Sequence, residues 1–298
     1  MSDDPKRSTT AQTSAEGLSQ EELDALVAAA DTGGRTPSKP VAMFIMLVAL
    51  AWSLFQLWIA SPVPFMLGFG IFNDTQARSF HLAFALFLAF AAYPAARGIF
   101  QTGLAIVVPV TLSALFIYGS RAGDPVWWIP AVAAVVIGAV LLGSPRQRIP
   151  AWEWLLAILG AATALYVFVY YAEISRRVGA PILQDFVMAV IGIMVLLEAT
   201  RRALGPALMI VATVFLIYTF LGPMMPSIIA HKGNSLSEVV NHQWITSQGV
   251  FGIALGVSTS FVFLFVLFGS LLDKAGAGNY FIQVAFSLMG HMRGGPAK

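Results

Sequence analysis

Long apolar stretches separated by short polar loops run through this chain from Val41 to Leu272. An α-helix rises about 1.5 Å per residue, so roughly 20 apolar residues cross the hydrocarbon core of a bilayer, which is about 30 Å thick. The chain is 58% hydrophobic and 11% charged, whereas about 25% of the residues of a typical soluble domain are charged. The stretches therefore predict a polytopic membrane protein.

The spans are expected to be helices. Lipid offers no hydrogen-bond partner to the backbone, so only helices and closed barrels cross a bilayer, and continuous apolar runs lack the alternating pattern of barrel strands. We expect an all-α bundle of about eight transmembrane helices. The expected spans are 41–60, 79–96, 100–118, 126–143, 151–171, 181–198, 203–221 and 250–272.

Residues 1–40 form a polar segment that we expect to be a cytoplasmic tail. It has no early apolar core of the kind that a secretory signal requires. Ser19 and Glu22 make a capping box that predicts a short helix at about 20–30; a docking role for the segment is the alternative. Lys and Arg are more frequent in the loops on the side of the N-terminus, which places it in the cytoplasm, although Arg176 and Arg177 oppose this orientation.

Several classes of function leave no trace in the sequence. There is no cysteine, which excludes disulfides, thiolate catalysis and zinc–thiolate sites. There is also no H-E-x-x-H, Walker loop or G-x-S-x-G motif, and no basic run typical of nucleic-acid binding. We interpret the four histidines, His81, His231, His242 and His291, as interfacial or solvated residues. The chain is therefore expected to be no enzyme, to bind no cofactor and to have no nucleic-acid partner.

Glu198 is the last residue of the sixth expected span. Arg201 and Arg202 follow at i+3 and i+4, where side chains pair across one helical turn. We interpret these three residues as a structural junction that clamps two spans together.

Other charges near the membrane have simpler interpretations. Asp185 lies one turn into its span. The preferred interpretation places it in the membrane interface, and the alternative pairs it with Arg176 or Arg177. Glu153 and Glu173 flank the fifth expected span and are interpreted as ordinary boundary charges.

The last expected span has an unusually polar centre. Gly252 and Gly256 have the GxxxG spacing of close helix packing. Ser258, Thr259 and Ser260 then place three hydroxyls in succession at mid-membrane depth. Tight packing, with hydroxyls bonded to helix carbonyls, is the preferred interpretation; a discontinuous region lining a path for solute or cation is the alternative. The three hydroxyl residues are therefore the candidates near a sodium or solute path.

The pattern changes after Leu272. Asn279, Gln283 and Ser287 recur every four residues on an otherwise apolar stretch, too short to span, which predicts an interfacial amphipathic helix at 279–290. A Gly-Gly-Pro run follows at 294–296. Because such a break normally links one element to the next, we expect this sequence to be the N-terminal part of a longer protein.

Four stretches carry a family resemblance. They are H-L-A-F at 81–84 with Y-P at 93–94, L-L-E-A-T-R-R at 196–202 with Gly205, G-V-F-G at 249–252 with F-L-F at 263–265 and F-G at 268–269, and G-H-M-R-G-G-P-A-K at 290–298. Together they resemble the fused membrane permease of tripartite ATP-independent periplasmic (TRAP) transporters. The similarity covers about residue 41 to the end, and its part from Glu198 onward is the specific one.

The resemblance implies a division of labour. Residues 41–200 would correspond to a small scaffold-like subunit, and 201–298 to the start of the large transport subunit, truncated at the Gly-Gly-Pro break. The stretch 279–290 would be an arm between the scaffold and a moving transport domain. Such systems lie in the bacterial inner membrane and import organic acids or related solutes with sodium as the coupling ion. A periplasmic binding protein, often of the TRAP-associated extracellular class, delivers the solute.

Two alternatives to a permease stay open. One is a non-transporting membrane scaffold or assembly subunit, whose helices only pack against partners and which has no reason to bind sodium. The other is a membrane-embedded enzyme, which the missing motifs disfavour.

Overall fold

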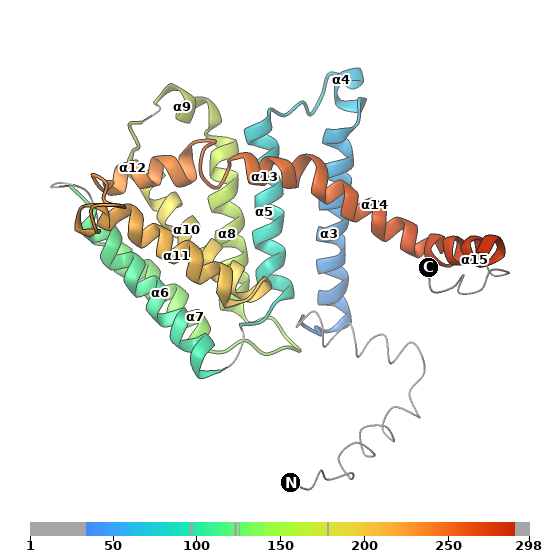
Figure 1. Ribbon diagram of the computed structural model, residues 1–298, viewed down its shortest axis with the longest axis horizontal. Coiled ribbons are helices and arrows are strands. Elements are labelled where there is room, and N and C mark those ends of the chain that lie inside the picture. Colours follow the sequence, from blue (N-terminus) through green and yellow to red (C-terminus); the bar gives the residue numbers. More distant parts are fainter. Residues whose placement is uncertain (1–33, 96–97, 122–123, 125, 178, 290–298) are drawn as a thin grey trace, which may run out of the picture.

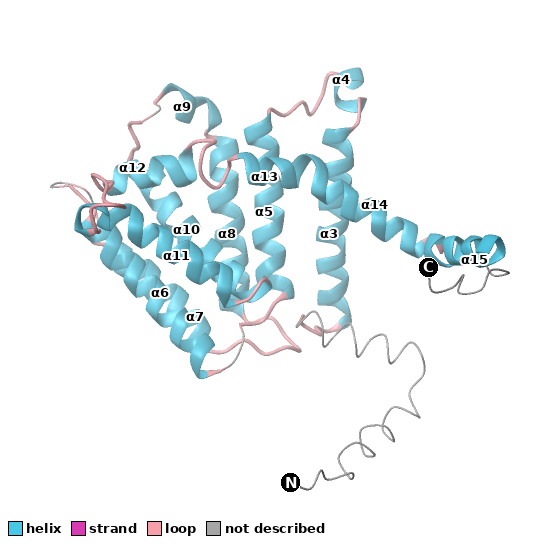
Figure 2. Cartoon of the chain, viewed as in Figure 1, coloured by secondary structure: helices cyan, strands magenta, loops and turns pink. Residues whose placement is uncertain are grey.

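The structure is a computed structural model that describes residues 34–289 apart from 96–97, 122–123, 125 and 178. Over these residues every regular element is a helix, as Figure 2 shows. The α-helices are α3 (Lys39–Ala60), α4 (Val63–Leu67), α5 (Asp74–Ala92), α6 (Ile99–Tyr118), α7 (Ile129–Leu141), α8 (Ala151–Val169), α9 (Tyr171–Arg176), α10 (Leu183–Ala203), α11 (Pro206–Leu221), α12 (Leu236–Val240), α13 (Ile253–Val257), α14 (Phe263–Lys274) and α15 (Ala277–Met289). The 3-10 turn η1 (Gly222–Met224) and the π-helical turns η2 (Asn241–Ile245) and η3 (Ser258–Val262) complete the order.

Six helices are long and apolar enough to cross a bilayer. They are α3, α6, α8, α10, α11 with the turn that follows it, and the helix Ile253–Lys274, which consists of α13, η3 and α14. The other two expected spans correspond to α5, whose first two turns are polar, and to α7, which has only 13 residues. The predicted all-α polytopic membrane bundle is confirmed.

The start of α5 differs from the prediction. The helix begins at Asp74, ahead of the expected start at residue 79. The backbone N–H of Gln76 donates to the Asn73 side chain at 2.9 Å, and the Asn73 N–H donates to the Gln76 side chain at 3.2 Å. This reciprocal cap stabilises a polar first turn, which a prediction based on apolar residues misses. The expected break after this helix is confirmed, because α5 ends at Ala92 and α6 begins at Ile99.

The end of α10 also differs. The sixth span was expected to end at Glu198, but α10 continues to Ala203 and therefore contains Arg201 and Arg202 as well. The chain leaves the helix at Gly205, whose φ of 86° suits glycine. Pro206 then occupies the first turn of α11, where its missing N–H has no intrahelical partner to lose.

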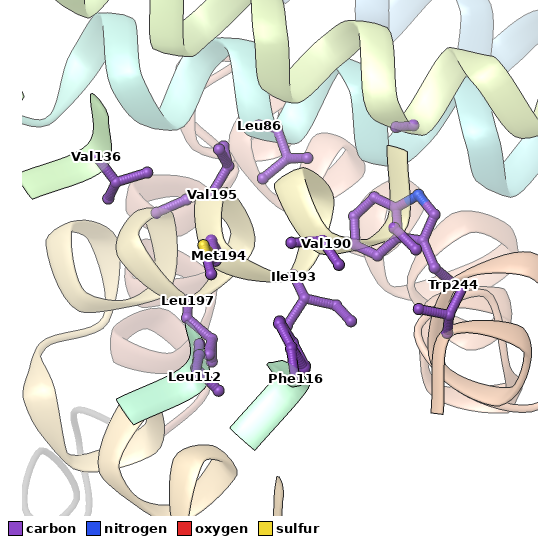
Figure 3. Close-up of a cluster of buried hydrophobic side chains, with 14 of the residues drawn as sticks. Leu86, Leu112, Phe116, Val136, Val190, Ile193, Met194, Val195, Leu197 and Trp244 are labelled. Atoms are coloured by element: carbon purple, nitrogen blue, oxygen red, sulfur yellow. The ribbon is translucent and has the colours of Figure 1, made fainter. Parts of the chain in front are cut away.

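α10 is the centre of the bundle. It packs against α5, α6, α7, α8 and α11. Of the residues in its most apolar 18-residue stretch, 61% are buried. Figure 3 shows this core, in which the side chains come from α10 and from the helices around it. Its labelled members are Leu86, Leu112, Phe116, Val136, Val190, Ile193, Met194, Val195, Leu197 and Trp244.

α3 and the helix Ile253–Lys274 lie at the edge of the bundle. In Figure 1 this last helix crosses α5 and α3 and projects beyond α3. Gln56 is the buried residue of α3, and no residue of α14 is buried. Apolar side chains exposed in this way face lipid in a bilayer, which is as apolar as they are.

α15 occupies the place of the expected amphipathic helix. Its position at the membrane interface stays a prediction. The short helix expected at about 20–30 lies outside the described residues.

Candidate functional site

The helix Ile253–Lys274 widens at its polar centre. η3 is a π-helical turn that continues α13 and α14 without a break, and the N–H of Phe263 donates to the carbonyl of Ser258. π-turns inside α-helices are rare and occur frequently at functional sites. The sequence pattern indicated hydroxyls at this position but gave no sign of the wider turn.

The three hydroxyl residues of this turn have different surroundings. Ser258 Oγ lies 3.1 Å from Nε2 of His81, whereas the hydroxyl of Thr259 donates to the carbonyl of Leu255 at 2.7 Å. Ser260 is exposed, and a cavity of about 170 Å³ lies beside it and Thr259. The cavity is also lined by Ile59, Ala60, Phe72, Asp74, Ala77 and Arg78.

His81 is a buried residue of α5, only 4% exposed. Its Nδ1 accepts hydrogen bonds from the indole N–H of Trp52, at 3.3 Å, and from the amide of Gln56, both on α3. The interpretation of His81 as interfacial or solvated is therefore wrong. Its polar partners come from helices distant in the sequence, so no local pattern indicates them.

Gly252 and Gly256 both lie close to neighbouring atoms. A Cβ on Gly256 would lie 2.6 Å from the guanidinium of Arg78, which donates to the carbonyl of Phe251 at 2.9 Å. A Cβ on Gly252 would lie 2.7 Å from the carbonyl oxygen of Gln248. A side chain at Gly252 would therefore meet the backbone, whereas one at Gly256 would have to displace the end of the Arg78 side chain. The role of the two glycines in helix packing stays a prediction.

Glu198, Arg201 and Arg202 are brought together inside the bundle. Glu198 accepts hydrogen bonds from Nε and Nη2 of Arg201, at 2.8 and 2.7 Å, and from Nε of Arg202 at 2.6 Å. Both arginine side chains have no exposed surface. Arg201 also donates to the Gln101 side chain of α6 at 3.1 Å. The group therefore links α10 to α6.

Two further residues extend this group. Glu153, in the first turn of α8, is fully buried and pairs with Arg202 and, at 3.3 Å, with Arg35. The interpretation of Glu153 as an ordinary boundary charge is wrong, because α8 packs that residue against α10. We call Arg35, Glu153, Glu198, Arg201 and Arg202 the ionic cluster.

Arg35 joins the ionic cluster from the segment before α3. It donates to the hydroxyl of Ser144 at 2.7 Å and to the carbonyl of Pro145 at 2.6 Å. Burial lowers the pKa of Arg35, and the charge of Glu153 opposes that shift. The cluster therefore ties α6, α8, α10, the loop after α7 and the chain before α3 to one another.

Asp185 is buried at the start of α10 and paired. It accepts hydrogen bonds from Nε and Nη2 of Arg177, at 3.1 and 2.9 Å, from the Tyr166 hydroxyl at 2.7 Å and from the Ile182 N–H at 2.9 Å. The preferred placement in the interface is wrong, and the alternative pairing with Arg177 is correct. The hydrogen bond to Asp185 raises the pKa of Arg177. Glu173 is exposed, as expected.

Asp185→Asn is expected to lower the free energy of unfolding by about 2 kcal/mol, because hydrogen bonds to a buried carboxylate are stronger than those to the neutral amide that replaces it. Thermal unfolding of the purified protein, followed by tryptophan fluorescence, measures this effect. The matched control is Glu173→Gln, which removes an exposed carboxylate on α9. Equal melting temperatures for both variants would contradict the prediction.

Residues 191–298 match the family described as "Tripartite ATP-independent periplasmic transporter, DctM component". The match begins within α10 and continues through η3 to α15. No curated protein and no solved structure gave a significant match. This family is a membrane component of a transporter and not an enzyme family. The part of the chain from residue 191 onward is therefore similar to the DctM component of TRAP transporters.

Proposed function

We propose that this protein is the permease of a sodium-coupled TRAP-type transporter that imports an organic acid or a related solute. A periplasmic solute-binding protein would deliver the solute to it. The single observation that carries the proposal is the match of residues 191–298 to the DctM component family. The six apolar helices of membrane-spanning length support placement in a bacterial inner membrane, for which we propose a cytoplasmic N-terminus.

The proposed division of labour has a structural consequence. A border between scaffold and transport parts at Thr200 and Arg201 falls inside the continuous helix α10. The family match also begins inside this helix, at residue 191. α10 would then belong to both parts, with the ionic cluster at its C-terminal end as the proposed junction.

Sodium would need oxygen ligands, as hard cations do. Among the described residues there is no group of three or more His, Asp or Glu side chains that could hold a metal ion. Hydroxyl oxygens are present, because Thr259 and Ser260 line the cavity beside η3 and Ser258 lies one residue before them. We propose Ser258, Thr259 and Ser260 as the residues of this chain near a sodium or solute path.

Uptake into proteoliposomes that contain the full-length gene product tests the proposal. Candidate solutes are first found as organic acids that raise the melting temperature of the partner binding protein. An inward sodium gradient is then expected to drive uptake of such a solute, in the presence of the binding protein, while an equal potassium gradient gives background uptake.

The other outcomes also decide between functions. Uptake that is indifferent to sodium would remove the sodium coupling and keep the transporter. The non-transporting scaffold would be the better function if no gradient drives uptake and if sodium, compared with potassium, leaves the melting temperature of the purified protein unchanged.

A further inference from the structure

Hydrogen bonds at His81 connect three helices. On one side of the ring, Nδ1 receives the indole N–H of Trp52 and the amide of Gln56, both from α3. On the other side, Nε2 lies 3.1 Å from the hydroxyl of Ser258, the first residue of η3. The ring itself stands on α5 and is 4% exposed.

This geometry fixes the position of the proton on the imidazole. An indole N–H can only donate, so Nδ1 of His81 must be the acceptor and carries no hydrogen. The single proton of the neutral ring is then on Nε2, which donates to Ser258. A proton on Nδ1 would point at the N–H groups of Trp52 and Gln56 and would disrupt the arrangement.

The contact lies where the helix Ile253–Lys274 leaves the bundle. Among the described residues, the bond between His81 and Ser258 is the one hydrogen bond that joins this helix to α3 or α5. Apolar packing accompanies this bond, because the ring centroids of Phe263 and Trp52 lie 4.6 Å apart. Beyond this point α14 has no buried residue and projects past α3 (Figure 1).

We propose that His81 is a positioning residue that holds the π-helical turn η3 against α3 and α5 in its neutral, Nε2-protonated form. The contact sets the direction in which α14 leaves the bundle. Sharp bends in helices occur at π-turns, among a few other features. We therefore expect η3 to be the place where this helix changes direction. The proposal concerns how this chain is held together and does not depend on sodium coupling or on the solute.

The first test is spectroscopic. Nitrogen-15 NMR of protein labelled at histidine distinguishes a protonated from an unprotonated Nδ1, and the His81→Gln variant identifies the signal. The wild type is expected to show an unprotonated Nδ1 and a protonated Nε2 at neutral pH. Trp52→Phe removes the indole donor and leaves Gln56, whose carboxamide can present either its NH₂ group or its oxygen to Nδ1. This variant is therefore expected to shift the signal toward a mixture of tautomers. A wild-type ring protonated on Nδ1 would overturn the proposal.

The second test measures the direction of α14. The chain has no cysteine, so spin labels can be attached at introduced cysteines alone. Labels at Leu50 on α3 and Leu271 on α14, both exposed, are expected to give one narrow distance distribution. Ser258→Ala and His81→Phe should broaden or shift it, and Ser260→Ala, which changes the exposed neighbouring hydroxyl, should leave it unchanged.

Rescue separates the hydrogen bond from ring packing. In His81→Gln the carboxamide oxygen can accept from α3 while the NH₂ group donates to Ser258, so this variant is expected to keep the narrow distribution. A broad distribution in both His81→Gln and His81→Phe would assign the effect to packing of the ring and overturn the proposal. Wild-type distances in Ser258→Ala would overturn it as well, even if His81→Phe fails to fold.

Discussion

Replacing Glu198 with alanine is expected to lower the free energy of unfolding by about 3–5 kcal/mol and to reduce the yield of folded protein in the membrane. The substitution removes the carboxylate that pairs with Arg201 and Arg202, whose side chains have no exposed surface. Arg202 keeps Glu153 as a partner, but Arg201 keeps only the neutral Gln101. Removing one partner of a buried ion pair is costly because it leaves an uncompensated buried charge.

Thermal unfolding of the purified variant in detergent measures the loss, which should lower the melting temperature by about 10 °C for a chain of this size. Glu238→Gln is the matched control, because Glu238 is 3.9 Å from Lys232 in an exposed pair, where little change is expected.

A double substitution tests whether the loss of stability comes from the uncompensated charge of Arg201. Replacing Glu198 with leucine and Arg201 with methionine removes both charges and keeps apolar volume. Because apolar replacement of a buried pair is often nearly neutral, the double variant should be more stable than Glu198→Ala alone. An unfolding temperature in Glu198→Ala equal to that of the wild type, with normal yield, would remove the junction role of Glu198.

The helices could be predicted from the sequence because a bilayer demands long apolar segments, and each of the eight expected segments corresponds to a helix. Their ends were harder to predict. The start of α5 depends on the cap made by Asn73 and Gln76. The end of α10 depends on Gly205 and Pro206 rather than on the first charge after the apolar run.

Polar contacts between residues close in the sequence could be predicted, whereas those between distant residues could not. The pairs of Glu198 with Arg201 and Arg202 are local, since i+3 and i+4 spacing brings side chains together on any helix. The pair of Arg35 with Glu153 joins parts of the chain that are far apart, so its existence depends on how α8 packs beside the chain before α3. No pattern along the sequence contains that information.

The candidate site beside η3 shows the same limit. The hydroxyls of Ser258, Thr259 and Ser260 were visible as a polar run in an apolar segment. The partner of Ser258 was not, because His81 is a lone histidine on another helix and its burial follows from contacts with α3. The π-helical turn is a backbone feature that residue types at these positions do not specify.

A second large effect is expected where α10 meets Trp244. A Cβ added to Gly192 would overlap the indole ring of Trp244, which is fully buried. The ring is held in place because its N–H donates to the carbonyl of Thr163 at 3.1 Å. Gly192→Ala is therefore expected to lower the free energy of unfolding by about 3 kcal/mol, at the upper end of the usual cost of overpacking a core.

Gly138, inside α7, is the matched control because a Cβ there meets nothing within 4 Å. Alanine at an open helical position stabilises by about 0.5–1 kcal/mol, since glycine loses more backbone entropy on folding. The same substitution should thus lower the melting temperature at Gly192 and raise it slightly at Gly138. If both variants were stabilised, Trp244 would have to move aside at no cost, and the close packing of η2 against α10 would not be a constraint on this fold. If only Gly192→Ala is destabilised, and Trp244→Phe restores part of the loss by making room for the Cβ, the indole ring is what requires glycine at position 192.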